Sequence, residues 1–588
     1  MLLPPVWAAL AAIAPLCELS AEPQPPFLES WEADGRLNLV RIVDAEAAGW
    51  LYFHPIYRDI YEVGSDVGGD RNEFRDQNRA RQLSRRGADL AVYNASWTGG
   101  LRATSRSIND YHYYRRNSDR WDSSIALGEA FAYLRWNPGG GESADPAPDG
   151  SALLPASIRS GERADSIAQL RPEHRPLPGL VLQGGRTALR SDPEGLLFVG
   201  ESPGGRLIYT GERSGRGGGL RVGVAGQVVD REVRAIGRPD HPAALYMGTL
   251  GWLGESWNLG ALYGFYRSPG RAAESDLYLP GFPPTRVALP TGQSALPDFD
   301  VHYYGLRYEH DWNTVSYTLS GFYNAGRSIA VDAAGTRVGS SRKSIRGALV
   351  YGEVVYHFDS EAGQASPGCV PVRPAANSCV RSRPLIRGPE LALAGLFGSR
   401  DANDGDDKHR GFGALRPVPS VLGGAASIFV SGPPVDREHP PLANTQPGVV
   451  FADGGLPDTR GRYPDGLQPD GFGRARDNVD PTPPEYDNEG LSMASLRFSF
   501  APFGGKAEAI TFDLFTNYAA FRTGSGWEGI AAARVPLEFV DARFALELSA
   551  TGASYRSNED EPDPVTGQDR RPGRKYYSRY RLGFSLAL

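Results

Sequence analysis

The chain ends in the stretch Arg579-Tyr-Arg-Leu-Gly-Phe-Ser-Leu-Ala-Leu588, in which every second residue is apolar. One row holds Tyr580, Leu582, Phe584, Leu586 and Leu588, and the other holds Arg579, Arg581, Gly583, Ser585 and Ala587. Because side chains along a β-strand point alternately to its two faces, this pattern predicts a strand with one apolar and one polar face.

The same period of two recurs along the chain from about residue 86. Clear examples are 220–228, 315–323 and 544–552, where apolar residues alternate with residues such as Arg221, Ser316 and Glu547. The runs are about ten residues long, which is the length of a tilted strand that crosses a membrane. Counting them predicts roughly eighteen strands, with an error of about two.

The connections between these runs are of two kinds. Very short turns at 254–256, 311–313 and 503–505 join paired runs, whereas the stretches 138–176, 268–298, 360–387 and 402–488 are long and rich in Gly, Pro and Asp. Short turns at one end of the strands and long loops at the other are typical of transmembrane β-barrels. We therefore expect an all-β fold, a transmembrane barrel of about 18 antiparallel strands with short periplasmic turns and long extracellular loops.

A soluble propeller or sandwich is the alternative, since its strands also alternate. Two features weigh against it. The polar rows carry charged residues such as Arg221, Arg534 and Glu547, which a dry core does not hold without partners. Aromatic residues such as Trp252 and Trp312 recur at strand ends, as the interfacial girdles of a membrane barrel require.

Composition excludes two other classes. Of the 588 residues, 72 are glycine and 47 are proline, which is below the share that indicates wholesale disorder. The mean hydropathy is −0.37, and no apolar run of about 20 residues follows the N-terminus, so a helical membrane bundle is excluded.

The N-terminus has the layout of a secretory signal. Residues 1–16 are mostly apolar but too short to span a bilayer, and Leu19-Ser20-Ala21 precedes Glu22-Pro23. We expect a signal peptide over 1–21, although no Lys or Arg precedes the apolar stretch. Lipidation at Cys17 is the weaker alternative.

The three cysteines agree with an extracytoplasmic compartment. Beyond Cys17 in the leader, Cys369 and Cys379 lie close together in a Pro- and Ser-rich segment. A disulfide between them suits an oxidising space, with two free thiols as the alternative.

Domain organisation follows from these elements. We expect an N-terminal segment with the first strands over 22–85 and the barrel over 86–588. The stretch 402–488 is too long for a simple connection, so we expect either a loop that folds into the pore as a constriction or a flexible surface loop. Its acidic start, 401–407, has oxygen ligands for Ca²⁺ but lacks the EF-hand spacing, and we expect no metal site.

The final strand also resembles the C-terminal signal of bacterial outer-membrane proteins. In those proteins the barrel assembly machinery reads an apolar alternating strand that usually ends in an aromatic residue, where this chain has Leu588. The resemblance implies a protein of the outer membrane of Gram-negative bacteria, in contact with outer-membrane lipid and inserted by that machinery.

Arginine dominates the basic residues. Lysine occurs only at positions 343, 408, 506 and 575, whereas most of the 62 basic residues are arginine. Several arginines fall on the polar rows, which face the lumen in a membrane barrel. Because guanidinium groups bind carboxylates through paired hydrogen bonds, a track of them favours anions. Acidic residues such as Glu129, Glu538 and Glu547 share those rows, so some arginines are paired and structural.

The segment 129–200 resembles the alginate export porin family. Glu129–Trp136 and Leu180–Asp192 are similar to its strand pair, and Gly185, Arg186, Leu189 and Asp192 fit its G-R-x-x-L-x-x-D stretch. The resemblance covers about an eighth of the chain and implies a monomeric eighteen-stranded barrel whose arginine-lined pore passes an anionic polysaccharide. The insertion at 138–176 and the extended 402–488 region depart from the family, which leaves the substrate open.

We therefore expect an anion-selective channel, with alginate or another polyuronate as the exported solute. The candidate pore-lining residues, on matched or polar-row positions, are Arg186, Arg190, Arg221, Arg307, Arg497, Arg534 and Arg581. A general small-solute porin is one alternative. A barrel scaffold that docks a periplasmic or electron-transfer partner is another, and it requires a wider lumen with more strands.

Catalytic signatures are missing from the sequence. It contains no His-Glu-x-x-His, no Gly-x-Ser-x-Gly, no phosphate-binding loop and no Cys-x-x-Cys motif. A lipase-type barrel, whose Ser and His meet only in space, is the enzymatic alternative. We expect no enzyme activity, no catalytic residues, no cofactor and no nucleic-acid partner.

Overall fold

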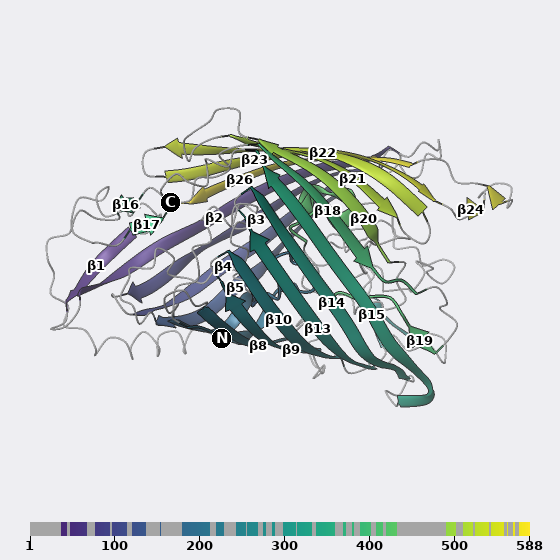
Figure 1. The fold of residues 1–588 in the computed structure, drawn as a ribbon, viewed down its shortest axis with the longest axis horizontal. Helices are drawn as coiled ribbons and strands as arrows, with labels where there is room; N and C mark the ends of the chain where they lie inside the picture. Colours follow the sequence, from purple (N-terminus) through teal and green to yellow (C-terminus); the bar gives the residue numbers. More distant parts are fainter. Residues whose placement is uncertain are drawn as a thin grey trace.

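The computed structural model is an antiparallel β-barrel (Figure 1). It describes residues 37–43, 48–67, 77–93, 97–114, 120–136, 153–154, 179–211, 219–228, 243–254, 256–268, 274–277, 285–288, 298–312, 314–331, 337–358, 369–371, 379–381, 389–401, 407–415, 419–431, 490–500, 510–520, 524–539, 542–557, 561–562, 569–570 and 575–587. The signal peptide expected over 1–21 lies outside these residues.

The main sheet contains 20 strands, of which β1 and β19 are short additions beside β2 and β15. The remaining 18 form a closed ring, because the last strand, β26, pairs with β23 on one side and with β2 on the other. Every pairing in the ring is antiparallel, between strands that follow one another along the chain or, for β26 and β2, between its two ends. The fold class and the strand number expected from the alternating sequence are confirmed.

The first half of the ring comprises β2 (Ala48–Val67), β3 (Gln77–Tyr93), β4 (Trp97–Tyr114), β5 (Arg120–Trp136), β6 (Gly179–Arg190), β7 (Val199–Thr210), β8 (Gly219–Val228), β9 (Ala244–Leu253) and β10 (Trp257–Ser268). The second half comprises β13 (Asp298–Asp311), β14 (Val315–Val331), β15 (Arg337–His357), β18 (Glu390–Gly398), β20 (Ser492–Phe500), β21 (Thr511–Ala520), β22 (Gly524–Phe539), β23 (Ala542–Ser557) and β26 (Lys575–Ala587).

The other elements are short. They are β1 (Leu37–Val43), β19 (Lys408–His409), the 3₁₀ turn η5 (Gly424–Ala426), the helix α2 (Ile428–Ser431) and three small hairpins: β11 (Glu274–Leu277) with β12 (Thr285–Ala288), β16 (Cys369–Pro371) with β17 (Cys379–Arg381), and β24 (Glu561–Pro562) with β25 (Asp569–Arg570). Among the described residues, no helix is long and apolar enough to cross a membrane.

The strand order corrects two expectations about the chain's layout. The boundary expected at residue 86 falls inside β3, and the ring already begins with β2. The four long connections also do not share one end. Those after β10 and β18 leave from one end of the barrel, which we call the loop end; those after β5 and β15 leave from the other, the turn end, where the chain also enters β2 and leaves β26.

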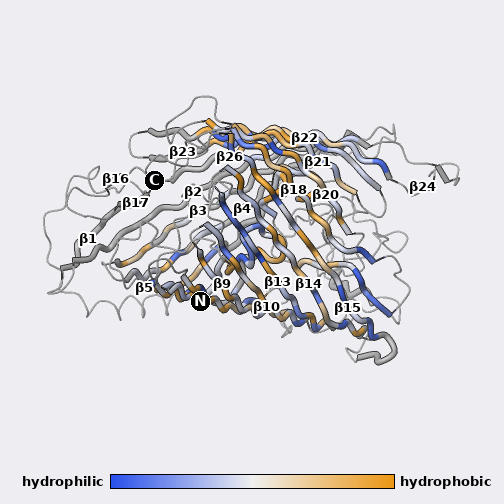
Figure 2. The backbone as a smooth tube through the Cα atoms, in the orientation of Figure 1, coloured by the Kyte–Doolittle hydropathy of each residue, from blue (hydrophilic) through white to orange (hydrophobic). Residues whose placement is uncertain are grey.

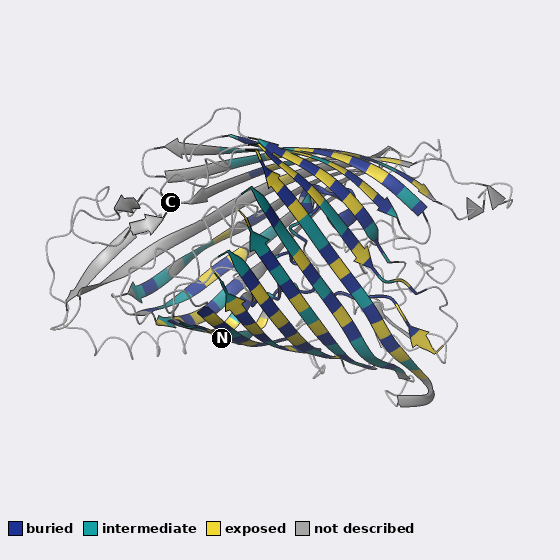
Figure 3. Ribbon diagram, viewed as in Figure 1, coloured by how far each residue is buried: buried dark blue, intermediate teal, exposed yellow. Residues whose placement is uncertain are grey.

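Side chains alternate between the two surfaces of the barrel as the sequence predicts (Figures 2 and 3). On the outward rows large apolar side chains are exposed, for example Leu306, Leu319, Val354 and Leu393. On the inward rows polar and charged side chains are buried, for example Gln183, Arg221, Asn517 and Glu528. Since a soluble protein buries its apolar side chains and exposes its polar ones, this inverted arrangement is that of an outer-membrane-type barrel.

Candidate functional site: the lumen and its constriction

Two segments fold from the loop end into the lumen. The first is the turn between β6 and β7, residues 191–198, and the second, residues 407–431 after β18, contains β19, η5 and α2. We call them the short and the long inward segment; 416–418 of the latter lie outside the described residues. The long inward segment is the start of the 402–488 stretch, so its inward course agrees with the expected constriction, whereas 432–489 lie outside the described residues.

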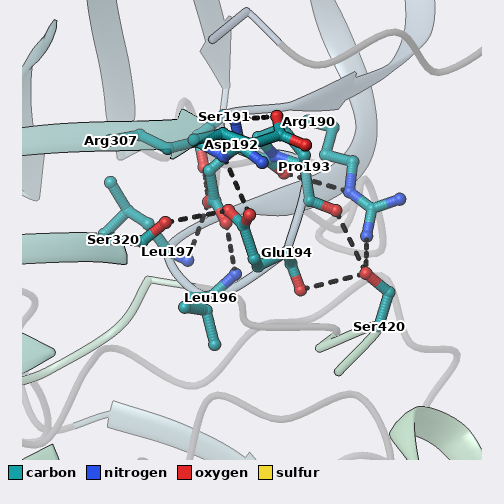
Figure 4. A network of polar contacts seen from close by, with 11 residues as sticks. Arg190, Ser191, Asp192, Pro193, Glu194, Leu196, Leu197, Arg307, Ser320 and Ser420 are labelled. Carbon is teal, nitrogen blue, oxygen red and sulfur yellow. Dashed lines mark hydrogen bonds and ion pairs between the residues drawn. The ribbon is translucent and has the colours of Figure 1, made fainter. Parts of the chain in front are cut away.

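Asp192 organises the short inward segment (Figure 4). Its carboxylate accepts hydrogen bonds from the backbone N–H groups of Leu196 and Leu197, at 2.8 and 3.1 Å, and from the Ser191 hydroxyl at 2.6 Å. These bonds hold the turn in one conformation with Leu196, Leu197 and Phe198 fully buried. Burial, and then the nearby charge of Glu194, raise the pKa of Asp192 above its ordinary value.

Glu194 joins this turn to the barrel wall. Its carboxylate accepts from Nε of Arg307 on β13 at 2.8 Å and from the Ser320 hydroxyl on β14 at 3.2 Å (Figure 4). Arg307 also donates to Glu309 at 3.2 Å, and its side chain is only 2% exposed. Arg307 therefore stabilises the constriction as a buried ion pair and does not present its charge to a passing solute.

The two inward segments are also bonded to each other. Arg190, at the end of β6, donates through Nη2 to the Ser420 hydroxyl at 2.8 Å, and Ser420 in turn donates to the carbonyl of Pro193 at 3.0 Å. Backbone hydrogen bonds run from Leu415 to Leu197 at 3.1 Å and from Ser420 to Glu194 at 2.8 Å. The segments thus form one structure inside the barrel.

The long inward segment contacts a third part of the wall through Glu528 on β22. This carboxylate accepts hydrogen bonds from the Ser427 hydroxyl, from the Asn517 side chain at 2.7 Å and from the first backbone N–H of α2, Ile428, at 2.8 Å. Thr551 on β23 donates to the Ala426 carbonyl at 2.7 Å. Contacts on β6, on β13 and β14, and on β21 to β23 are spread around the ring, so the inward segments cross the lumen.

Apolar packing completes the constriction. Leu415, Leu422, Ile428 and Phe429 are buried in one cluster with inward-facing wall residues. Leu153 and Leu154, from the connection between β5 and β6 at the turn end, join the same cluster and bond to the backbone of Arg190 and Ser191. Chain from both ends of the barrel therefore meets in its middle.

The structure places five of the seven candidate arginines on inward rows, namely Arg221, Arg307, Arg497, Arg534 and Arg581. Arg190 has the parity of the outward row, but it lies at the end of β6 and its side chain bonds to Ser420 of the long inward segment. Arg221 and Arg497 are buried, Arg534 and Arg581 are half-buried, and Arg190 and Arg307 hold the inward segments. Arg497 pairs with Glu353 at 3.5 Å and with Glu390 at 3.7 Å.

Arg186 lies away from the lumen. It is in register with Ala130 and Pro203, and it shares an outward row with the exposed Leu182. The expectation that Arg186 lines the pore is therefore wrong. Gly185, at φ +128°, lies beside it, and a side chain there would come within 2.5 Å of the Ala130 carbonyl oxygen. The matched residues Gly185, Leu189 and Asp192 instead build the strand end and turn that direct the short segment inward.

Several charged groups of the lumen were not among the candidates. Arg102 on β4 and Arg206 on β7 are buried on inward rows. Arg206 lies close to Arg221 and Glu129, and Arg102 lies 5.8 Å from the Phe131 ring centre. Glu194 and Glu528 were missed because nothing local in the sequence shows that they bond to Arg307 and Ile428, which are 113 and 100 residues away. The alternating pattern alone marks Arg102, Arg206 and Glu528 as inward.

The two remaining cysteines lie on the facing strands β16 and β17. Cys369 is opposite Arg381, and Cys379 is opposite Pro371, so the cysteines are diagonal neighbours. Such neighbours are roughly 7–8 Å apart, beyond the usual Cα separation of a disulfide, so this register does not bring the expected pair face to face. Among the described residues, no three His, Cys, Asp or Glu side chains are grouped to hold a metal ion.

Comparisons with known proteins give only distant similarities. No protein-family model matches the chain, and no curated protein matches it in sequence. Solved structures that align with it include Pseudomonas aeruginosa OccK5 (OpdH), with 11% identity over 91% of this chain and 98% of that one, and a TM-score of 0.37. Acinetobacter baumannii OccAB1 has 8% identity over 91% and 97%, and a TM-score of 0.40. P. aeruginosa OccK2 (OpdF), solved with glucuronate, has 12% identity over 91% and 98%, and a TM-score of 0.36. At this level of similarity, the assignment of the chain to the antiparallel β-barrels rests on its own strand order, register and inverted polarity.

Proposed function

We propose that this chain is an outer-membrane channel of Gram-negative bacteria, not an enzyme, and that it passes compact anionic solutes through a lumen narrowed by its own inward segments. The observation that carries the proposal is the inverted polarity of a closed ring. Its outward rows are apolar, and its inward rows bear buried and half-buried polar and charged side chains. A polar interior inside an apolar shell provides a path for hydrated solutes across a bilayer.

Arginine on the inward rows supports selectivity for anions. Arg534 and Arg581 are half-buried there. The carboxylates of Glu194, Glu390 and Glu528 are buried and are bonded to Arg307, to His357 and to the start of α2, respectively. Guanidinium groups that are partly exposed along a path attract carboxylates and release them again when several weak sites follow one another.

The inward segments favour compact solutes over polymers. A polyuronate chain needs a continuous opening along the whole barrel, whereas 191–198 and 407–431 are fastened across it. Alginate-type export, implied by the family resemblance, therefore requires these segments to move, and it remains the second candidate. A scaffold for a periplasmic or electron-transfer partner is disfavoured, since the ring has no more strands than expected for a channel and its own chain fills the centre.

Planar-bilayer recording of the refolded protein tests this proposal. We expect a Cl⁻-selective current that glucuronate, a single uronate unit, reduces reversibly in proportion to its concentration. Block by a long polyuronate added at the turn end, from which an exported chain would enter, would favour polymer export. A current without ion preference or block would identify a general porin and contradict the anion proposal. The double variant R534Q/R581Q should lower Cl⁻ selectivity, with R327Q, on the outward surface, as its matched control.

A further inference from the structure

A group of arginines lies on the outer surface of the barrel, just beyond its apolar belt. On four adjacent strands the outward row changes abruptly from apolar to charged toward the loop end. Arg267 on β10, Asp300 on β13, Arg327 on β14, and Arg342 and Arg346 on β15 form this group, which we call the rim patch.

Strand register shows that the patch is continuous. Arg267 is opposite Asp300, which is opposite Arg327, and Arg346 is opposite Ala325, two positions before Arg327. Arg327 bonds to Asp300 at 2.8 Å, and Arg267 lies 3.9 Å from the other carboxylate oxygen. Arg267 and Arg327 thus share one carboxylate, and Arg342 and Arg346 lie on the neighbouring strand. Arg267 remains 59% and Arg327 43% exposed, so most of this positive charge faces outward.

The surface below the patch is that of a membrane-embedded wall. Leu306 and Leu319 are exposed on the same outward rows. A layer of aromatic rings lies between these leucines and the arginines. The Tyr263 hydroxyl and His302 Nδ1 are hydrogen-bonded at 2.8 Å, and the ring centres of Phe265 and His302 are 5.0 Å apart. Amphipathic rings at this level mark the boundary between acyl chains and headgroups.

The outward rows of β10 to β15 carry four arginines at the loop end, whereas β23, on another side of the ring, carries one there, Arg556. On β18, β20 and β21 the outward rows reach the same end of the barrel with Phe397, Ser492 and Ala520, and none of these three positions is charged. A general solubilising rim would place charge all around, so the concentration of arginine on β10 to β15 indicates a localised ligand.

We propose that the rim patch binds the phosphate groups of a phosphorylated glycolipid in the outer leaflet, with the acyl chains packed on the apolar rows below. The proposal rests on the outer-membrane placement proposed above. The loop end faces outward in such a barrel, because its longest connection leaves there while the chain enters and leaves the ring at the opposite end. Phosphate suits the patch, since guanidinium groups bind its oxygens through two parallel hydrogen bonds.

The test uses the full refolded barrel and lipid A in detergent, with thermal unfolding on gels as the readout. We expect diphosphoryl lipid A to raise the unfolding temperature and dephosphorylated lipid A to have little effect. R327Q/R346Q should bind lipid A roughly 30-fold more weakly, whereas R327K/R346K retains much of the effect and R534Q/R581Q, which removes two inward arginines, retains all of it.

Three results would overturn the site: equal stabilisation of R327Q/R346Q, equal stabilisation by dephosphorylated lipid A, or the full effect from inorganic phosphate alone, which would indicate a free-anion site. Bilayer conductance of the same samples separates this proposal from the channel function. Loss of lipid stabilisation with normal conductance contradicts only the rim patch, and lipid stabilisation without conductance contradicts only the channel.

Discussion

At the scale of single residues, the charged groups of the lumen divide into those that hold the structure and those that face the path. Arg307 and Glu528 are buried and bonded to the inward segments, whereas Arg534 and Arg581 are half-buried on inward rows. Arginines of the lumen therefore have different roles, because a carboxylate from an inward segment reaches Arg307, whereas Arg534 and Arg581 stay half-buried on the wall.

Replacing Gly185 tests the backbone of the turn. Ala at this position has to adopt φ +128° and places its Cβ 2.5 Å from the Ala130 oxygen, so we expect G185A to destabilise the barrel by at least about 2 kcal/mol. At the neighbouring Gly184 a Cβ meets nothing within 4 Å. Heat unfolding measures both variants, and G184A should behave like wild type. An equal loss of stability in G184A and G185A would show that the positive φ and the close Ala130 oxygen are not the cause.

Removing Arg307 tests the buried ion pair. R307A leaves the Glu194 carboxylate buried without its cation, and we expect a loss of about 3–5 kcal/mol in urea unfolding. The exposed pair of Arg327 with Asp300 provides the control, since R327A should cost less than about 1 kcal/mol. Similar losses in R307A and R327A would mean that Glu194 does not depend on Arg307.

At the scale of elements, the long inward segment is held at its far end by one carboxylate. E528A removes the acceptor for Ser427, Ile428 and Asn517, and we expect residues 419–431 to detach at a cost of about 2–4 kcal/mol. Single-channel recordings should then show larger and noisier currents. E528Q keeps one acceptor oxygen and should show an intermediate effect, and T516V, on an outward position of β21, should show none.

The short inward segment should respond to pH through Asp192. Because its pKa is raised when the segment is docked, the docked state binds a proton more readily than the undocked one, so this carboxyl favours docking most at low pH and less as pH rises through the raised pKa. The protection factors of the Leu196 and Leu197 amides, which correct the exchange rates for the intrinsic pH dependence of amide exchange, should rise on acidification below neutral pH. D192N should lose that pH dependence, and an unchanged profile in D192N would contradict the assignment.

At the scale of the whole molecule, the sequence predicted the architecture better than the site. The period of two identified the strands, their number and their inward rows, since each of these depends on local alternation. The end of the barrel at which a connection lies depends on whether an odd or an even number of strands precedes it, and local alternation does not reveal that number. The connections 138–176 and 360–387 were therefore placed at the wrong end. The match of Arg186 to a sequence motif did not show whether its side chain faces the lumen or the outside. Its register with Ala130 places it on the outward row.

The contacts that cross the lumen lie beyond what a single sequence shows. Glu194 and Arg307 are 113 residues apart, and Glu528 and Ile428 are 100 apart. Only the closure of β2 on β26 brings these partners to one interior. The expectation that the 402–488 stretch enters the pore named no contacts with the wall, and the structure supplies the residues that hold its first part there.

The most direct test of the account compares single-channel currents of the wild-type protein with those of a variant that lacks residues 419–431. We expect wild type to give a small Cl⁻-selective conductance and the deletion variant, still a folded barrel by heat-modified gel migration, to give a several-fold larger one. Equal conductance in the two proteins, or none in either, would contradict a lumen that is a conducting path narrowed by this segment.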